Sequence, residues 1–439
     1  EMYYYRWWSL RKHIKETPVG YGMTEFLVQR SYSDKYNLIA CAIGHHIYES
    51  RWLRDPKYLD QIIHTWYRGN DGGPMKKMDK FSSWNADAVL ARYMVDGDKD
   101  FMLDMTKDLE TEYQRWERTN RLKNGLYWQG DVQDGMEESI SGGRKKKYAR
   151  PTINSYMYGN AKALSIMGIL SGDEGMAMRY GMRADTLKSL VENDLWNTRH
   201  QFFETMRSDS SANVREAIGY IPWYFNLPDT TKKYEVAWKE IMGEKGFSAP
   251  YGLTTAERRH PEFRTRGVGK CEWDGAIWPF ASAQTLTAMA NFMNNYPQTV
   301  LSDSVYFRQM ELYVESQYHR GRPYIGEYLD EVTGYWLKGD QERSRYYNHS
   351  TFNDLMITGL IGLRPRLDDT IEINPLIPAD KWDWFCLDNV LYHGHNLTIL
   401  WDKNGDRYHC GKGLRIFVNG KEAGHADTLT RLVCENALK

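Results

Sequence analysis

The stretch Ala86-Asp-Ala-Val-Leu-Ala-Arg-Tyr-Met-Val95, followed by Asp96-Gly-Asp98 and by Phe101 to Trp116, decides the fold. Apolar residues recur at helical spacing on both sides of the Gly-Asp turn, which predicts a helical hairpin. The same order occurs again in Ala161 to Leu170, Ser171-Gly-Asp173 and Ala177 to Leu190. A repeated order of helix, Gly-Asp turn and helix indicates an internal repeat of helical hairpins.

Further segments fit this repeat. Helices are predicted over Tyr36 to Arg54, Tyr58 to Tyr67, a pair around Trp238, Ile277 to Met293, Tyr306 to Tyr318, and Phe352 to Leu363. Long loops rich in Gly, Pro and aromatic residues separate the hairpins: 69–83, 123–151, 220–228, 249–273 and 319–347. Loops of this length in a compact domain are usually functional. We therefore expect a toroid of paired helices whose loops gather at one mouth.

After Arg364-Pro365 the pattern changes from helical spacing to alternation. Thr370 to Asn374, Asn396 to Trp401 and Leu414 to Val418 alternate as strands do, and Asn419-Gly420 is a strong hairpin turn. The sequence thus predicts a helical domain over residues 1–365 and a small β-sandwich over residues 366–439.

Composition excludes several classes of protein. The net charge of the 439 residues is −1, which gives no sign of a nucleic-acid or membrane surface, and no apolar run reaches the length of a membrane span. Five scattered cysteines without CxxC spacing predict neither a structural zinc site nor a disulfide framework. We expect no metal and no cofactor, and the oligomeric state is left open. The 16 tryptophans and 31 tyrosines are typical of carbohydrate sites. The chain starts at Glu1 without a signal peptide, as it would if a leader or an upstream domain had been removed.

An acidic loop at 124–139 carries Asp131, Asp134, Glu137 and Glu138 together with Trp128. Sugar faces stack on aromatic rings and sugar hydroxyls bind carboxylates, so this composition favours a sugar site. The alternative is a solvated acidic loop.

Two more loops carry a carboxylate among aromatic residues. Asp274 lies between Trp273 and Trp278, as a sugar ligand between two walls or as part of a capped helix with packed tryptophans. Glu327 stands between Gly326 and Tyr328, as a general base or as the partner of Arg320 or Arg322.

Four segments carry a resemblance to a known family: Asp134-Gly-Met-Glu137, Pro151 to Tyr158, Trp273 to Pro279, and Gly326-Glu-Tyr328 with Asp330 to Gly334. They resemble the (α/α)6-barrel glycoside hydrolases, in particular the group of mannosylglycerate hydrolase, trehalase and processing glucosidase. The resemblance implies an (α/α)6 toroid and an O-glycosyl hydrolase that acts on a carbohydrate. Two positions depart from the family pattern. The acid position holds Glu137 where the family has Asp, so Asp131 and Asp134 remain rivals, and Asp274 replaces an Arg.

We therefore predict an exo-acting, inverting glycosidase with Glu137 as general acid and Glu327 as general base, in a secreted or periplasmic location. The predicted substrate-binding residues are Trp128, Asp131, Asp134, Trp273, Asp274, Trp278, Tyr347 and His349. Two other classes stay open, namely a polysaccharide lyase on a similar toroid, which would use Tyr347 or His349, and a non-catalytic sugar-binding protein. Within the hydrolases, a β-L-arabinofuranosidase is an alternative to an α-glucosidase or mannosidase type.

Overall fold

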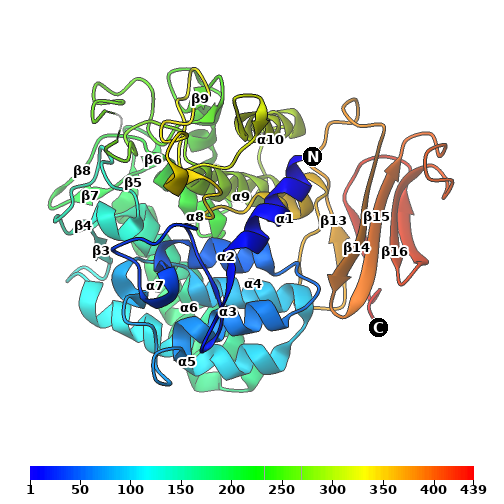
Figure 1. Ribbon diagram of the computed structural model, residues 1–439, viewed down its shortest axis with the longest axis horizontal. Coiled ribbons are helices and arrows are strands. Elements are labelled where there is room, and N and C mark those ends of the chain that lie inside the picture. The colour runs from blue at the N-terminus through cyan, green and yellow to red at the C-terminus, as the bar shows by residue number, and fades with distance from the viewer. Residues whose placement is uncertain (232, 268) are drawn as a thin grey trace.

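The computed structural model describes residues 1–231, 233–267 and 269–439. Within these residues, helices contact one another in a closed ring in which each meets the next and the last meets the first. Figure 1 shows the helical body beside the strands of the carboxyl-terminal part. The ring consists of α2 (Ile43–Ser50), α4 (Asn85–Asp96), α6 (Pro151–Ser171), α8 (Ile221–Tyr224), α9 (Pro279–Asn295) and α11 (Phe352–Leu355). This is the inner layer of an (α/α)6 toroid, so the predicted fold is confirmed.

An outer layer of helices pairs with the ring. It consists of α1 (Met2–His13), α3 (Lys57–Arg68), α5 (Lys99–Asn120), α7 (Glu174–Leu190) and α10 (Asp303–Ser316). The outer partner of α11 is α1, so the two ends of the helical region close the ring. A buried guanidinium fastens this closure, since Nη2 of Arg6 donates to the carbonyl and the hydroxyl oxygens of Ser350 at 3.0 and 2.9 Å.

The helical pair predicted around Trp238 is present in a shortened form. The inner helix α8 has a single turn, and its outer partner is a 3-10 segment over Glu235–Ile241. Trp238 is fully buried there and stacks on Phe292 with ring centroids 5.1 Å apart. Aromatic packing therefore fills the space that two longer helices would occupy.

The Gly-Asp turns explain why the hairpins form where they do. Gly97 ends α4 at φ 73° and Gly172 ends α6 at φ 80°, a left-handed conformation that glycine adopts without steric cost. The aspartate that follows each glycine starts the next helix. The side chain of Asp98 accepts from the amide of Phe101 at 3.0 Å, and that of Asp173 from the amide of Met176 at 2.8 Å.

The connections between helices are unequal in length, and this places the mouth. Those that follow an inner helix are short, whereas those that lead into an inner helix are long. The long connections therefore all lie at the amino-terminal ends of the inner helices. They contain the short strands β1 (Ile14–Thr17), β2 (Gly20–Met23), β3 (Trp128–Gln129), β4 (Tyr148–Ala149), β5 (Trp196–Asn197), β6 (Phe202–Phe203), β7 (Met206–Arg207), β8 (Ser210–Ser211), β9 (Ser248–Ala249), β10 (Gly252–Leu253), β11 (Tyr318–His319) and β12 (Arg322–Pro323).

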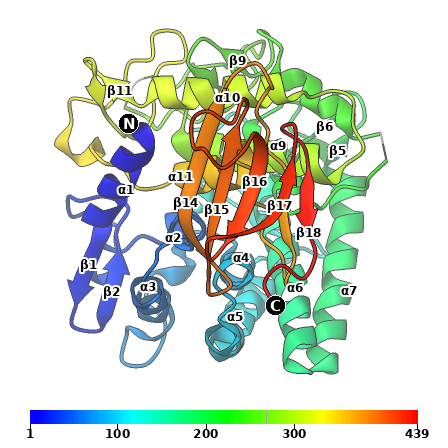
Figure 2. The same cartoon turned by 90° about the vertical axis from the view of Figure 1, so that its right-hand side faces the viewer.

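The carboxyl-terminal part is all β (Figure 2). Its strands are β13 (Ile371–Ile373), β14 (Trp384–Tyr392), β15 (His395–Asp402), β16 (Gly413–Val418), β17 (Lys421–Ala426) and β18 (Leu432–Cys434). Strands β14 to β17 form an antiparallel sheet in sequence order, and β13 pairs with β18. Asn419 at φ 51° and Gly420 at φ 80° make the predicted hairpin turn between β16 and β17.

This β unit packs on the side of the barrel that lies away from the mouth. The turn between β14 and β15 meets the end of α4, where the amide of His393 donates to the carbonyl of Val95 at 2.7 Å. The end of α4 carries one of the short connections. The β unit therefore leaves the long loops at the opposite end uncovered.

Candidate active site

The acidic loop is tied to the helix that follows it. A 3-10 turn over Asp131–Asp134 ends at Gly135, with φ 69°. The Asp134 carboxylate accepts from Nε of Arg150 at 2.5 Å and from the hydroxyl of Thr152 at 2.7 Å. Arg150 and Thr152 stand at the start of α6, and the Asp134–Arg150 ion pair has no solvent exposure. This pair holds one side of the segment that carries Glu137.

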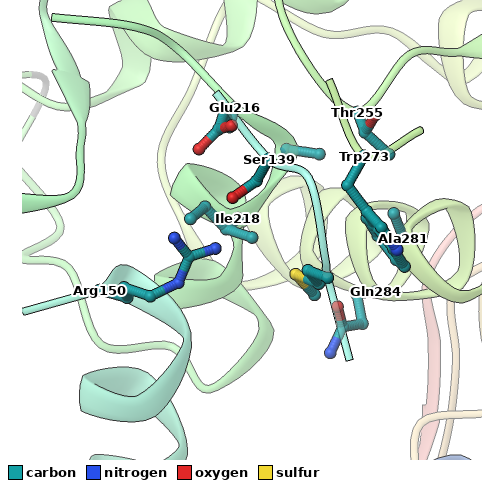
Figure 3. A pocket seen from close by; sticks show the side chains of 10 residues that line it. Ser139, Arg150, Glu216, Ile218, Thr255, Trp273, Ala281 and Gln284 are labelled. Atoms are coloured by element: carbon teal, nitrogen blue, oxygen red, sulfur yellow. The ribbon is translucent and has the colours of Figure 1, made fainter. Parts of the chain in front are cut away.

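The other side of that segment is held by Glu216. The Glu216 carboxylate accepts from the backbone amides of Ile140 and Ser141 at 2.8 and 3.2 Å, and also from the Ser141 hydroxyl. Figure 3 shows Arg150 and Glu216 on one side of a small internal cavity and Trp273 on the other. The cavity measures about 10 Å³, so it is a gap of water size behind the loop and too small for a sugar.

Glu137 lies between these two anchors, half-buried, and the next residue, Glu138, has φ 64°. Backbone strain of this kind is common at functional sites. Burial raises the pKa of Glu137 most, and repulsion by Asp131 and Glu327 raises it further, while a backbone amide and Arg144 lower it. A carboxyl whose pKa is raised is suited to give up a proton near neutral pH.

Glu327, in contrast, lies beside two cationic side chains. It is buried at 5% exposure, and its carboxylate lies 3.2 Å from Nζ of Lys338 and 3.8 Å from Arg343, with the Ser344 hydroxyl donating at 3.3 Å. Its cationic partners are thus Lys338 and Arg343, in place of the Arg320 or Arg322 considered from the sequence. The ion pairs and the hydroxyl hydrogen bond hold the Glu327 carboxylate in one position, as a general base requires.

Sequence reasoning missed a third carboxyl at this place, that of Glu25. Its pKa is raised to about 8, chiefly by burial and in addition by repulsion from Glu327 and Glu137. The charges of Glu25, Glu137 and Glu327 repel one another, so the three carboxyls lie in one neighbourhood of the structure. A lone glutamate between Thr24 and Phe26 offers no motif that distinguishes it from a surface residue.

The aromatic residues of the second loop stack on one another. The Trp278 ring is parallel to those of Trp273 at 4.3 Å and Tyr328 at 4.5 Å, and two rings this close must cover its two faces. No face of Trp278 is left for a sugar, which corrects its prediction as a stacking wall. Trp273 is buried on the same stack, at 4% exposure. Trp128 is half-buried, and Nζ of Lys147 lies 4.4 Å from its ring centroid.

The predicted aspartate ligands have structural surroundings. Oδ2 of Asp134 already accepts hydrogen bonds from Arg150 and Thr152. Asp274 is fully buried, and its Oδ2 accepts from the amide of Arg266 at 2.9 Å. Helix α9 begins only at Pro279, so Asp274 does not cap it. Asp131 is buried at the start of its turn and accepts from the amide of Val132 at 2.8 Å. The carboxylate of Asp134 therefore has a structural role, and Asp131 lies near Glu137. Oδ1 of Asp274 has no hydrogen-bond partner among the described residues, so Asp274 stays a predicted sugar ligand.

Tyr347 and His349 lie at the mouth, as expected, in a buried aromatic contact. Their ring centroids are 3.9 Å apart, and Tyr347 donates to Glu25 at 2.7 Å. Burial lowers the pKa of His349 well below its ordinary value, so its imidazole is neutral. Its Nε2 has no hydrogen-bond partner within residues 1–231, 233–267 and 269–439.

The described residues offer neither a metal site nor a membrane-spanning helix. In the described part of the chain, no group of three or more His, Cys, Asp and Glu side chains is placed to hold a metal ion. No described helix combines the length and the apolar character that a membrane crossing requires.

The fold and the mouth carboxyls define the class of a six-hairpin glycosidase. The model of the mannosylglycerate hydrolase MGH1-like glycoside hydrolase domain matches residues 35–350, and the chain belongs to this family. The model of the glycosyl hydrolase family 65 C-terminal domain matches residues 363–425. The chain thus carries a glycoside hydrolase domain by family.

Solved structures show the same fold. The GH63 mannosylglycerate hydrolase from Thermus thermophilus, in complex with Tris and D-glycerate, matches 81% of this chain and 98% of its own at 11% identity, with a TM-score of 0.62. A GH78 family rhamnosidase of a Bacillus species matches 86% of this chain and 37% of its own at 10% identity, with a TM-score of 0.60.

A solved chain named "Sialidase" matches the whole of this chain at 99% identity, with a TM-score of 0.99. The present chain spans 40% of the length of that chain. That name therefore belongs to a longer protein, of which this chain resembles one part.

Proposed function

We propose that the chain is an exo-acting, inverting glycosidase in which Glu137 is the general acid and Glu327 the general base. The observation that carries this proposal is the contrast between two carboxyls at one mouth. Burial, with repulsion by Asp131 and Glu327, raises the pKa of Glu137, whereas the carboxylate of Glu327 is ion-paired with Nζ of Lys338 at 3.2 Å. A carboxyl with a raised pKa that shares a site with a carboxylate held by an ammonium is typical of an acid and base pair.

In the proposed reaction, Glu137 gives its proton to the glycosidic oxygen as the bond from that oxygen to the anomeric carbon breaks. Glu327 takes a proton from a water molecule, whose oxygen bonds to the anomeric carbon from the opposite face. The product sugar has the inverted configuration, Glu137 is left ionised and Glu327 protonated. Exchange of both protons with solvent restores the starting state. The exo mode rests on the family resemblance, and a secreted or periplasmic location stays a prediction.

The test is a screen of aryl glycosides and plant and host glycans that includes α-glucosides, α-mannosides and β-L-arabinofuranosides. On any substrate that is cleaved, Glu137→Gln and Glu327→Gln should each reduce kcat by at least about a hundredfold, since acid–base catalysis contributes at this scale. The matched control is Glu315→Gln, an exposed position on the outer helix α10, which should retain full activity. Circular dichroism should show all three variants folded. Full activity in either site variant would refute the assignment of that residue.

A second candidate is hydrolysis of an acidic sugar. The longer solved chain carries the name "Sialidase", and three cationic groups lie around the carboxyls described here. Lys338 and Arg343 flank Glu327, and the positive charge of Arg144 lowers the pKa of Glu137. A sugar carboxylate would find a partner among such groups. Sialosides in the same screen decide this candidate, because cleavage of neutral glycosides alone would exclude it.

A further inference from the structure

Glu25 is held in the mouth by two segments that are distant in sequence. It follows β2 and precedes α2, and its side chain is nearly fully buried. The amide of Asn348 donates to the carbonyl of Glu25 at 2.9 Å, and Nδ2 of Asn348 donates to the carbonyl of Thr24 at 3.2 Å. The position of the Glu25 side chain is therefore fixed relative to Tyr347 and the segment that leads into α11.

The two oxygens of the Glu25 carboxyl differ. Oε1 accepts a hydrogen bond from the Tyr347 hydroxyl at 2.7 Å. Oε2 is buried, and the described residues supply no hydrogen-bond partner for it. Buried polar atoms in proteins nearly always have a partner, so an unpaired oxygen at a substrate mouth points to a ligand.

No basic side chain in the described part of the chain lies within 4.0 Å of the Glu25 carboxyl, in contrast to Glu327 beside Lys338. Besides burial, the carboxyls of Glu137 and Glu327 raise the pKa of Glu25, and the hydrogen bond from the Tyr347 hydroxyl lowers it. Tyr32 and Cys41 lie near Glu25, whose negative charge raises the pKa of both side chains. A negative charge on Glu25 would thus be buried beside two other carboxyls without a counter-ion, which is costly.

We propose that Glu25 is a further substrate-binding residue of this site, with a neutral carboxyl that donates a hydrogen bond from Oε2 to an oxygen of the sugar bound between Glu137 and Glu327. The inference rests on the proposed function, because it places the sugar between the same two residues. Glu25 thereby selects sugars that present a hydrogen-bond acceptor at this point. The accepted bond from Tyr347 fixes which oxygen carries the proton.

The raised pKa of Glu25, about 8, agrees with this arrangement. Because the value lies above that of a free glutamate, the neutral carboxyl dominates at pH 7 and is lost as the pH rises through about 8. The donor function should therefore fail on the alkaline side.

The deciding comparison is between Glu25→Gln and Glu25→Ala. A glutamine amide is neutral, nearly isosteric, accepts from Tyr347 through its oxygen and donates through its nitrogen. Glu25→Gln should therefore keep kcat/KM within about threefold of wild type at pH 7. Glu25→Ala should lose about tenfold to a hundredfold, mainly in KM, as expected for one hydrogen bond to a buried site. Glu16→Gln, at an exposed position on β1, is the matched control and should be unchanged.

A second readout needs no turnover. Infrared difference spectra between pH 7 and pH 9.5 should show a protonated-carboxyl band that disappears with a midpoint near pH 8 in the wild type and is missing in Glu25→Gln. Absence of this band from the wild type would overturn the neutral carboxyl. A folded Glu25→Gln as inactive as Glu137→Gln would also overturn the inference, because Glu25 would then be the proton donor. If the wild type cleaves no glycoside while the band is present, the failure lies in the proposed function.

Discussion

Removal of the Asp134 carboxylate tests how the acidic loop is held. In Asp134→Ala, Arg150 stays in place with no solvent exposure and loses the partner at 2.5 Å, and Thr152 loses its acceptor at 2.7 Å. Breaking a buried ion pair from one side costs about 3–5 kcal/mol, because the remaining charge is buried without compensation. This is a large part of the roughly 5–15 kcal/mol by which domains are stable.

The assay is equilibrium urea denaturation, followed by tryptophan fluorescence and by far-ultraviolet circular dichroism. Asp134→Ala should lower the free energy of unfolding by about 3–5 kcal/mol. The double variant Asp134→Ala with Arg150→Met should recover only part of this loss, since the buried guanidinium is gone but the buried carboxylate of Glu216 loses its nearby cation. As a control, Glu315→Ala removes an exposed ion pair with Arg308 on α10 and should change the stability by less than about 1 kcal/mol. A loss below about 1 kcal/mol in Asp134→Ala would refute the claim that this pair anchors the loop.

Two further predictions concern the same end of the barrel. Gly135→Ala should lower kcat. Gly135 has φ 69°, and an added Cβ would lie 2.3 Å from Sγ of Cys41, so the loop that carries Glu137 must shift. An unchanged kcat would contradict this. His46→Gln should flatten the acid side of the stability profile. Burial lowers the pKa of His46 to about 4, below its unfolded value near 6.5. The free energy of unfolding of the wild type is therefore unaffected by this group above pH 6.5 and falls as the pH drops toward 4. Over this window the wild type should lose roughly 3 kcal/mol more than the variant in urea titrations, and parallel profiles would contradict the assignment.

Much of the fold could be predicted because the signals are local. Gly97 and Asp98, like Gly172 and Asp173, end one helix and begin the next through their own backbone and side-chain bonds, so their sequence determines the hairpin. The same holds for the Asn419-Gly420 turn. The closure of the ring by α1 could not be predicted, since it depends on contacts of Arg6 with Ser350 across almost the whole helical region.

The site was harder to predict for a physical reason. Sequence places Trp273 and Trp278 beside an acidic residue, but it does not show whether an aromatic face meets a sugar or another ring. The sequence identifies Asp134 as a carboxylate but does not show that it forms a buried ion pair with Arg150. Glu25 gives no local signal, because its character comes from burial and from two carboxyls on other loops. The roles of Glu137 and Glu327 stay predictions that activity measurements must decide.

The most direct test of the acid and base pair is the stereochemistry of the first product. Proton NMR spectra recorded immediately after enzyme addition to a cleaved glycoside show the anomer before mutarotation. The sugar should first appear with inverted anomeric configuration, because Glu327 is proposed to activate water on the face opposite the leaving group. First appearance of the retained anomer would mean that a carboxylate attacks the sugar directly, and it would contradict the account.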